Sequence, residues 1–168
     1  SVGYEARNLT GITVGLAGCG NIARYLIRFL KPFRCRVIAF DPFLDAATIA
    51  ARGAEKVSFN ELLEQSDVIS VHCHLTDETR HMFDAAAFRR MKKNSFIVNV
   101  SRGALIDTYA LADAIRIGDL QGAGLDTHES EPLALDHPLR TIDSVILTPH
   151  SAHYSSKAFE TLRMHMVD

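Results

Sequence analysis

Several residues that can bind an anion or exchange a proton stand just after apolar runs of this sequence. Arg102 follows one such run, Asp126 follows another and His150 follows the last, with Glu131 between the latter two. An arginine binds a carboxylate through two parallel hydrogen bonds, and a histidine exchanges a proton near neutral pH. Combined in one site, these residue types can hold an anionic substrate and carry a proton to or from it.

Each of these residues has a plainer interpretation when it is taken singly. Arg102 can be a solvated loop charge, His150 a histidine in a turn, Glu131 an exposed glutamate and Asp126 a cap for the segment that follows it. Ligands of open α/β sheets bind beyond the carboxyl ends of the strands. The shared position of these residues at the ends of apolar runs therefore favours the functional interpretation.

The elements that must position these residues alternate between short apolar runs and longer segments with helical periodicity. This alternation is typical of βαβ units and predicts an α/β fold with a doubly wound parallel sheet. We interpret residues 1–168 as one domain. The expected strands are 12–17, 36–40, 55–57, 68–72, 96–100, 123–125 and 145–147, and the expected helices are 21–31, 58–64, 107–117 and one that begins after Asp84 and ends near Lys92.

A glycine-rich stretch, GLAGCGNIA, joins the first expected strand to the first expected helix. Gly18 permits a tight turn, Gly20 lets a pyrophosphate approach the backbone, and Ala23 allows the helix to pack closely. The free amides at the start of a helix favour an anion there. A glycine-rich turn without a ligand is the alternative, but the position between strand and helix predicts a Rossmann-type dinucleotide-binding loop.

Asp41 follows the second expected strand, where a carboxylate can accept both hydroxyl groups of a ribose. The same carboxylate would repel the 2′-phosphate of NADP, and Pro42, Phe43 and Leu44 supply no arginine to bind that phosphate. A turn aspartate in an Asp-Pro pair is the alternative for this residue alone. Together with the glycine loop, Asp41 predicts NAD as the cofactor.

The composition favours small molecules and proteins as partners. The 168 residues carry a net charge of −2 with both signs interspersed, and this pattern gives no electrostatic footprint for nucleic acid or a membrane surface. No apolar run is long enough to span a bilayer. The three cysteines lack CxxC spacing and indicate a reducing, cytoplasmic compartment, although a chain that begins with Ser1 can have lost a targeting segment.

Taken together, these motifs resemble the NAD-binding domain of the D-isomer-specific 2-hydroxyacid dehydrogenases. The resemblance covers essentially the whole chain and implies an NAD-dependent oxidoreductase that transfers hydride between a nicotinamide cofactor and the 2-carbon of a D-2-hydroxy acid or 2-oxo acid. It also implies a homodimer and a separate substrate lobe that is absent from this chain, so we expect little turnover from the cofactor lobe alone. The motifs are GLAGCGNIA, FDP at 40–42, SDVISVHCHLTDETRHMFD at 66–84, NVSRGALID at 99–107, GAGLDTHESEP at 122–132 and ILTPHSAHYS at 146–155.

The resemblance also assigns roles to individual residues. Arg102 would hold the carboxylate and carbonyl of the substrate, Glu131 would hydrogen-bond the histidine, and His150 would act as acid and base. Asp41 would bind the adenosine ribose, and Asp126 the nicotinamide carboxamide. The full set of positions expected against the cofactor is Gly18, Gly20, Asn21, Ile22, Asp41, Cys73, Val100, Ser101, Arg102, Asp126 and His150.

Two alternatives remain open. The stretch from His150 to Ser155 most resembles the branch of the family that contains the C-terminal-binding-protein corepressors, although His153 stands where a tryptophan is usual there. That branch suggests an NAD(H)-responsive protein-interaction module as the alternative function. His72, His74, His150 and His153 are also candidate metal ligands, but their spacing matches no known zinc site, so we expect no metal.

Overall fold

The structure of the protein, a computed structural model, describes residues 8–155 of the chain. Its centre is a seven-stranded sheet in which every strand pair is parallel. The order across the sheet is β3-β2-β1-β4-β5-β6-β7, so the direction of winding reverses between β1 and β4. The strands are β1 (Thr13–Ala17), β2 (Arg36–Phe40), β3 (Glu55–Lys56), β4 (Val68–Val71), β5 (Ser95–Asn99), β6 (Leu120–Leu125) and β7 (Val145–Leu147).

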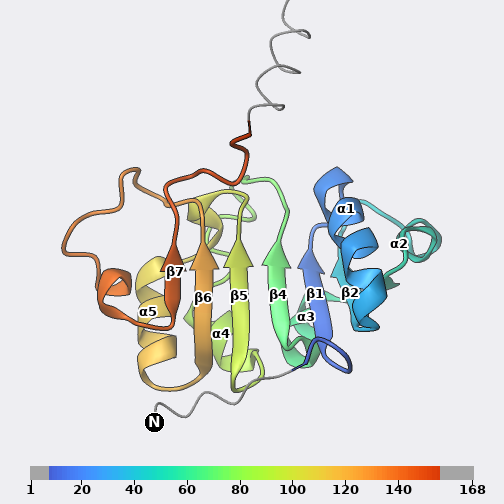
Figure 1. Ribbon diagram of the computed structural model, residues 1–168, viewed down its shortest axis with the longest axis horizontal. Coiled ribbons are helices and arrows are strands. Elements are labelled where there is room, and N and C mark those ends of the chain that lie inside the picture. The colour runs from blue at the N-terminus through green and yellow to red at the C-terminus, as the bar shows by residue number, and fades with distance from the viewer. Residues whose placement is uncertain (1–7, 156–168) are drawn as a thin grey trace, which may run out of the picture.

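Helices cover the two faces of the sheet unevenly (Figure 1). One face carries α1 (Asn21–Leu30) and α2 (Ala46–Arg52) over β1 and β2, and the other carries α3 (Phe59–Gln65), α4 (Ala85–Arg90) and α5 (Thr108–Arg116). Over β4 to β7, the face that carries α1 has no helix from residues 8–155. None of the described helices is long and apolar enough to cross a membrane.

Two apolar clusters hold these layers together. The larger cluster packs α3, α4 and α5 against the sheet and includes the fully buried side chains of Phe88 and Leu111. The smaller cluster packs α1 and α2 against β1 and β2 through Leu16, Ile27 and Ile49. Because α1 is held against the sheet directly after β1, the loop between them is fixed at both ends.

The fold expected from the sequence is confirmed. The sheet is parallel and has the seven expected strands. β2 and β7 have the expected bounds, and the other five differ from them by one to three residues at one or both ends. A capping box opens the helix expected from residue 58, because the Ser58 side chain accepts the amide of Glu61 while the Glu61 carboxylate accepts the amide of Ser58. Local sequence signals therefore placed most elements correctly.

Two expectations about helices were wrong. No helix was expected at α2, which Asp45 caps at its start and Gly53 ends with φ +95°, because its seven residues show no clear helical period. The fourth helix, α4, ends at Arg90 rather than near Lys92, because Met91 already has an extended backbone. The basic side chains of its last turn are therefore Arg89 and Arg90.

Candidate functional site

The loop between β1 and α1 has the backbone geometry that an approaching phosphate requires. Gly18 has φ +92°, and its amide donates to the carbonyl oxygen of Phe40 at 2.8 Å. A Cβ at Gly18 would lie 2.8 Å from the amide nitrogen of Cys73, whereas a Cβ at Gly20 would meet no atom within 4 Å. Gly20 caps α1 without a side-chain hydrogen bond, so the first amides of the helix are free to bind an anion.

Asp41 joins this loop to the end of β2. Its Oδ2 accepts the amide of Cys19 at 2.9 Å, and its Oδ1 accepts the amide of Phe43 at 3.0 Å. The side chain is buried, and each carboxylate oxygen keeps a second acceptor position after these bonds. Asp41 can therefore accept hydroxyl groups without losing its two backbone contacts. Asn21 and Ile22 are exposed in the first turn of α1.

The segments after β4 and β5 are joined to each other. The Ser101 hydroxyl donates to the carbonyl oxygen of Cys73 at 2.7 Å, and the Ser101 amide donates to Oδ1 of Asn99 at 2.9 Å. Burial raises the pKa of the Cys73 thiol to about 11, so the thiol stays protonated at neutral pH and behaves as a small apolar group. Val100 is partly exposed and precedes Ser101 at the same edge of the sheet.

Asp126, directly after β6, holds the segment that follows β7. Its carboxylate accepts the Thr148 hydroxyl at 2.5 Å and the amides of Ser151 and Ala152, each at 2.9 Å, while its carbonyl oxygen accepts the amide of His150 at 2.8 Å. Burial alone would raise the pKa of Asp126, but the hydrogen bonds from Thr148, Ala152 and Ser151 and the nearby His150 lower it. These four bonds fix the backbone on both sides of His150.

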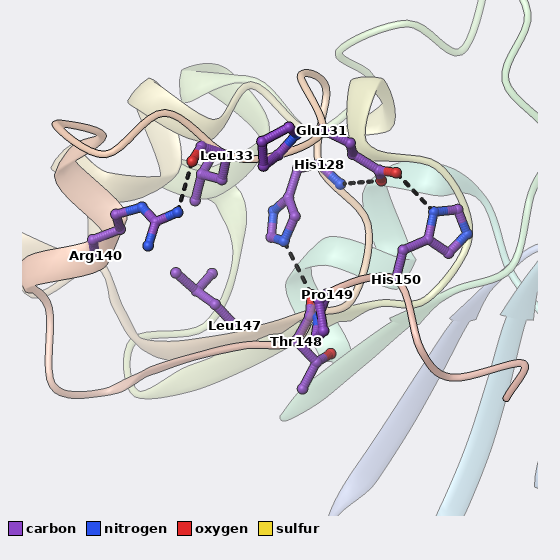
Figure 2. A pocket seen from close by; sticks show the side chains of 9 residues that line it. His128, Glu131, Leu133, Arg140, Leu147, Thr148, Pro149 and His150 are labelled. Atoms are coloured by element: carbon purple, nitrogen blue, oxygen red, sulfur yellow. Dashed lines mark hydrogen bonds and ion pairs between the residues drawn. The ribbon is translucent and has the colours of Figure 1, made fainter.

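His150 and Glu131 form a hydrogen-bonded pair at this edge (Figure 2). Nδ1 of His150 lies 2.9 Å from Oε2 of Glu131, and the His128 amide donates to Oε1 at 3.0 Å. The bonds from His150 and His128 lower the pKa of Glu131, so the glutamate is ionised and accepts the proton on Nδ1. In the neutral ring Nε2 is therefore the basic nitrogen, which can take up and return a proton.

Arg102 stands apart from this pair. Its side chain is exposed, and its guanidinium donates to the carbonyl oxygen of Ser101 at 2.7 Å. Within residues 8–155, no hydrogen bond or ion pair joins Arg102 to Glu131 or His150. A guanidinium has five N–H donors, so Arg102 keeps enough of them to bind a carboxylate at the rim.

His128 and Thr148 belong to the site although the sequence analysis did not identify them. Besides its amide bond to Glu131, His128 has its ring Nε2 3.1 Å from the carbonyl oxygen of Thr148, and Thr148 binds Asp126. A signal for His128 was present in the sequence. His128 and Glu131 are three residues apart, the same spacing as Ser58 and Glu61, whose amide and carboxylate form one bond of the capping box.

A hollow of about 400 Å³ lies beside Glu131 and His150, which form part of its lining (Figure 2). Leu133 and Leu147 give it apolar walls, and Arg140 is held at its rim by donating to the carbonyl oxygen of Leu133 at 2.6 Å. His128 also lines the hollow, and its Nδ1 is buried without a hydrogen-bond partner among residues 8–155. Arg102 does not line this hollow, so the hollow and the carboxylate-binding position proposed for Arg102 are distinct.

The histidines considered as metal ligands have other surroundings. Nε2 of His72 lies 2.9 Å from the Ser70 hydroxyl, and burial lowers the pKa of His72. The ring of His153 packs edge-on against that of His150, with centroids 5.6 Å apart. Among the described residues, no group of three or more His, Cys, Asp or Glu side chains is placed to hold a metal ion.

Comparison with known proteins was made at the level of sequence and of fold. The sequence model of the D-isomer specific 2-hydroxyacid dehydrogenase family, NAD binding domain, matches residues 2–152. The chain is 39% identical over 155 residues to a D-3-phosphoglycerate dehydrogenase of Mycobacterium leprae, covering 92% of this chain and 29% of that protein. It is also 39% identical over 154 residues to a glyoxylate reductase of Korarchaeum cryptofilum, and this match covers 92% of this chain and 46% of that protein.

Solved structures agree with the sequence matches. A D-lactate dehydrogenase from Aquifex aeolicus, complexed with NAD and lactic acid, superposes with a TM-score of 0.87 at 33% identity, covering 97% of this chain and 53% of that one. The chain thus spans about half of that enzyme and less than half of the two sequence relatives above. The match concerns the NAD-binding part of these proteins.

Proposed function

This chain belongs to the D-isomer-specific 2-hydroxyacid dehydrogenases as an NAD-binding domain, and we propose that it serves an oxidoreductase acting on small 2-hydroxy or 2-oxo acids. The reaction would transfer hydride between NAD and the 2-carbon of a D-2-hydroxy acid. The observation that carries this proposal is the hydrogen-bonded pair of Glu131 and His150, which lies at the same sheet edge as the glycine loop.

The cofactor would lie across the carboxyl ends of the strands. The amides at the start of α1, near Gly20, Asn21 and Ile22, would face its pyrophosphate. Asp41 would accept the adenosine ribose hydroxyls through the acceptor positions that Cys19 and Phe43 leave free. The remaining contacts proposed for the cofactor are Gly18, Cys73, Val100, Ser101, Arg102, Asp126 and His150.

Asp126 is well suited to one contact with the nicotinamide carboxamide. Two donors already occupy its Oδ1, whereas Oδ2 accepts only the Ala152 amide and can accept one further N–H. That bond would tie the nicotinamide end of the cofactor to the residue whose carbonyl oxygen accepts the amide of His150. Cofactor position and histidine position are therefore set by one residue.

The protein residues would supply binding and proton transfer, while NAD supplies the hydride acceptor. Arg102 would bind the substrate carboxylate through two parallel hydrogen bonds. Nε2 of His150 would take the hydroxyl proton as hydride leaves, and would return it when a 2-oxo acid is reduced. Glu131 would keep the ring oriented, because its carboxylate lies 2.9 Å from Nδ1.

The names of the relatives favour this function over the alternative. The matched proteins are named as a phosphoglycerate dehydrogenase, a glyoxylate reductase and a lactate dehydrogenase. An NAD(H)-responsive interaction module of the corepressor type gains no specific support from them. We therefore retain the oxidoreductase as the proposed function.

We also propose that the protein is a homodimer in the cytoplasm. All three cysteines, at positions 19, 35 and 73, are free thiols, in agreement with a reducing compartment. Ile22, Tyr25 and Phe29 expose 58% to 70% of their surface along one side of α1. An exposed apolar stripe of this kind supports association with a second copy.

Two substitutions separate cofactor binding from chemistry in the protein that contains this chain. We expect Asp41→Ala to weaken NADH binding about tenfold, the cost of losing hydrogen bonds to a charged acceptor. We expect His150→Asn to weaken NADH binding less than about threefold, because His150 is one of many proposed cofactor contacts, and to lower NADH oxidation by 2-oxo acids at least about 100-fold. Calorimetric titration measures the first effect, and absorbance of NADH with a panel of 2-oxo acids measures the second.

Asp113→Ala provides the matched control, because Asp113 is an exposed carboxylate on α5 whose ion pair with Arg116 joins neighbouring turns of the same helix. It should change neither quantity. If His150→Asn still oxidised NADH in the presence of a 2-oxo acid at the native rate, His150 would not be the proton donor. Unchanged NADH binding in Asp41→Ala would remove the proposed ribose contact.

A further inference from the structure

A groove between α1 and α2 gathers three arginines away from the site described above. Its volume is about 410 Å³, and its lining consists of Arg24, Arg28, Thr48, Ala51 and Arg52. Arg24 and Arg28 come from α1, and the other three residues come from α2. None of these five lining residues is acidic, and three of them carry a guanidinium group.

Arg24, Arg28 and Arg52 have no acidic partner among the described residues. Elsewhere Arg36 pairs with Glu55 at 2.7 Å and Arg90 pairs with Glu64 at 2.6 Å. Among the described residues, Arg24 and Arg28 form no ion pair and no side-chain hydrogen bond. Their donors are therefore available to a ligand.

The arrangement costs stability when the groove is empty. Arg24 and Arg28 are four residues apart on one side of α1, where like charges destabilise a helix. Arg24 also lies near the helix N-terminus, where the macrodipole disfavours a cation. An anion bound between the arginines would reverse both effects.

Arg52 links the groove to the glycine loop. Its guanidinium donates to the carbonyl oxygen of Cys19, whose amide binds Asp41. The side chain of Arg52 is only partly exposed, so its orientation is more restricted than that of the other two arginines. A ligand held by Arg52 would therefore lie close to the cofactor loop and still outside it.

We propose that this groove binds the phosphate group of a small phosphorylated ligand through the guanidinium groups of Arg24, Arg28 and Arg52. Planar guanidinium groups match the oxygens of a phosphate. The phosphate can belong to a free metabolite or to the 2′-phosphate of NADP(H). The site lies outside the machinery proposed for hydride transfer and does not depend on that reaction.

The test uses inorganic pyrophosphate as the probe, titrated calorimetrically at fixed ionic strength, with and without saturating NADH. We expect saturable binding in both conditions. Arg28→Gln should weaken it at least fivefold, because one charged hydrogen-bond donor is lost. Arg89→Gln is the matched control: Arg89 is exposed on α4, across the sheet, and has no acidic partner among residues 8–155.

The outcomes are distinct. Loss of pyrophosphate binding when NADH is present would place the probe at the cofactor loop and overturn the proposal. Equal weakening by Arg89→Gln, or an absence of binding, would overturn it too. NADPH that binds more weakly in Arg28→Gln than in the native protein, and that excludes pyrophosphate, would identify the 2′-phosphate as the source. Pyrophosphate that binds in the presence of either NADH or NADPH would identify a free phosphorylated metabolite as the source of the phosphate. This outcome does not depend on whether NADH binds through Asp41.

Discussion

Gly18 and Gly20 belong to one loop but meet different surroundings. A Cβ on Gly18 would lie 2.8 Å from the amide nitrogen of Cys73 and 2.9 Å from the carbonyl carbon of His72, and the residue has φ +92°. A Cβ on Gly20 would contact nothing within 4 Å, and the backbone there has φ −75°. The fold therefore requires a glycine at position 18, whereas at position 20 only a ligand that approaches the loop would require one.

Alanine at each position should separate these requirements. We expect Gly18→Ala to lower the free energy of unfolding by roughly 2–4 kcal/mol, since backbone atoms cannot move away from the added Cβ. We expect Gly20→Ala to leave it within about 0.5 kcal/mol and to weaken NADH binding at least tenfold. Denaturant unfolding and NADH titration measure the two effects. Normal NADH affinity in Gly20→Ala would contradict a close approach of the pyrophosphate.

Residue types identified the polar groups of the site but not their bonds. Asp41, Glu131 and His150 could be selected from the sequence because each follows an apolar run or lies between two of them. The three-residue spacing of His128 and Glu131 allowed their bond, but the bond from the His128 ring to Thr148 depends on the course of the loop between β6 and β7. The direction of the Arg102 side chain could not be predicted either, because a long exposed side chain can adopt several rotamers.

At the scale of elements, Asp126 connects the end of β6 to the segment after β7. Its carboxylate has a lowered pKa, so the stability that it contributes is fully present above the ordinary range of an aspartate, about 3.9. This contribution is lost as pH falls through the lower pKa of the folded state. The segment that contains His150 is therefore expected to loosen in acid before the sheet unfolds.

The substitution Asp126→Ala should produce the same loosening at neutral pH. Removal of an acceptor for three donors is expected to cost roughly 1–3 kcal/mol, and the difference from the native protein should shrink as the pH is lowered. Hydrogen exchange at the amides of Ser151 and Ala152 reports the local effect, and thermal unfolding reports the total. A difference that grows in acid would show that the sign assigned to Asp126 is wrong.

Element boundaries were predictable where capping residues mark them. Ser58 and Glu61 mark the start of α3. Asp107 marks the start of α5, because its side chain accepts the amides of Tyr109 and Ala110. The missed helix α2 has a cap at Asp45 as well, but its short apolar pattern resembles that of a loop. A cap alone therefore does not reveal a helix of two turns.

For the whole molecule, the main feature is the uneven covering of the sheet. The side chains of Phe96 and Val98 on β5 are partly exposed, and Ile146 on β7 is 69% exposed, on the face that carries α1. Periodicity predicted the strands but could not show which face would lack a helix, because that depends on the order of the strands. The exposed side of α1, with Ile22, Tyr25 and Phe29, adds to the apolar surface.

A dimer formed through the exposed side of α1 should depend on its apolar side chains. We expect Phe29→Lys to shift the protein towards the monomer in sedimentation equilibrium, since a charge would be buried against a second copy at a cost of several kcal/mol. Phe43→Lys is the matched control, because Phe43 is 93% exposed in the connection after β2, away from that side of α1. Both variants should unfold at the temperature of the native protein, because neither side chain belongs to a buried cluster. A monomer that is already present without substitution would contradict self-association, and an equal effect of the two variants would indicate that the dimer does not form through α1.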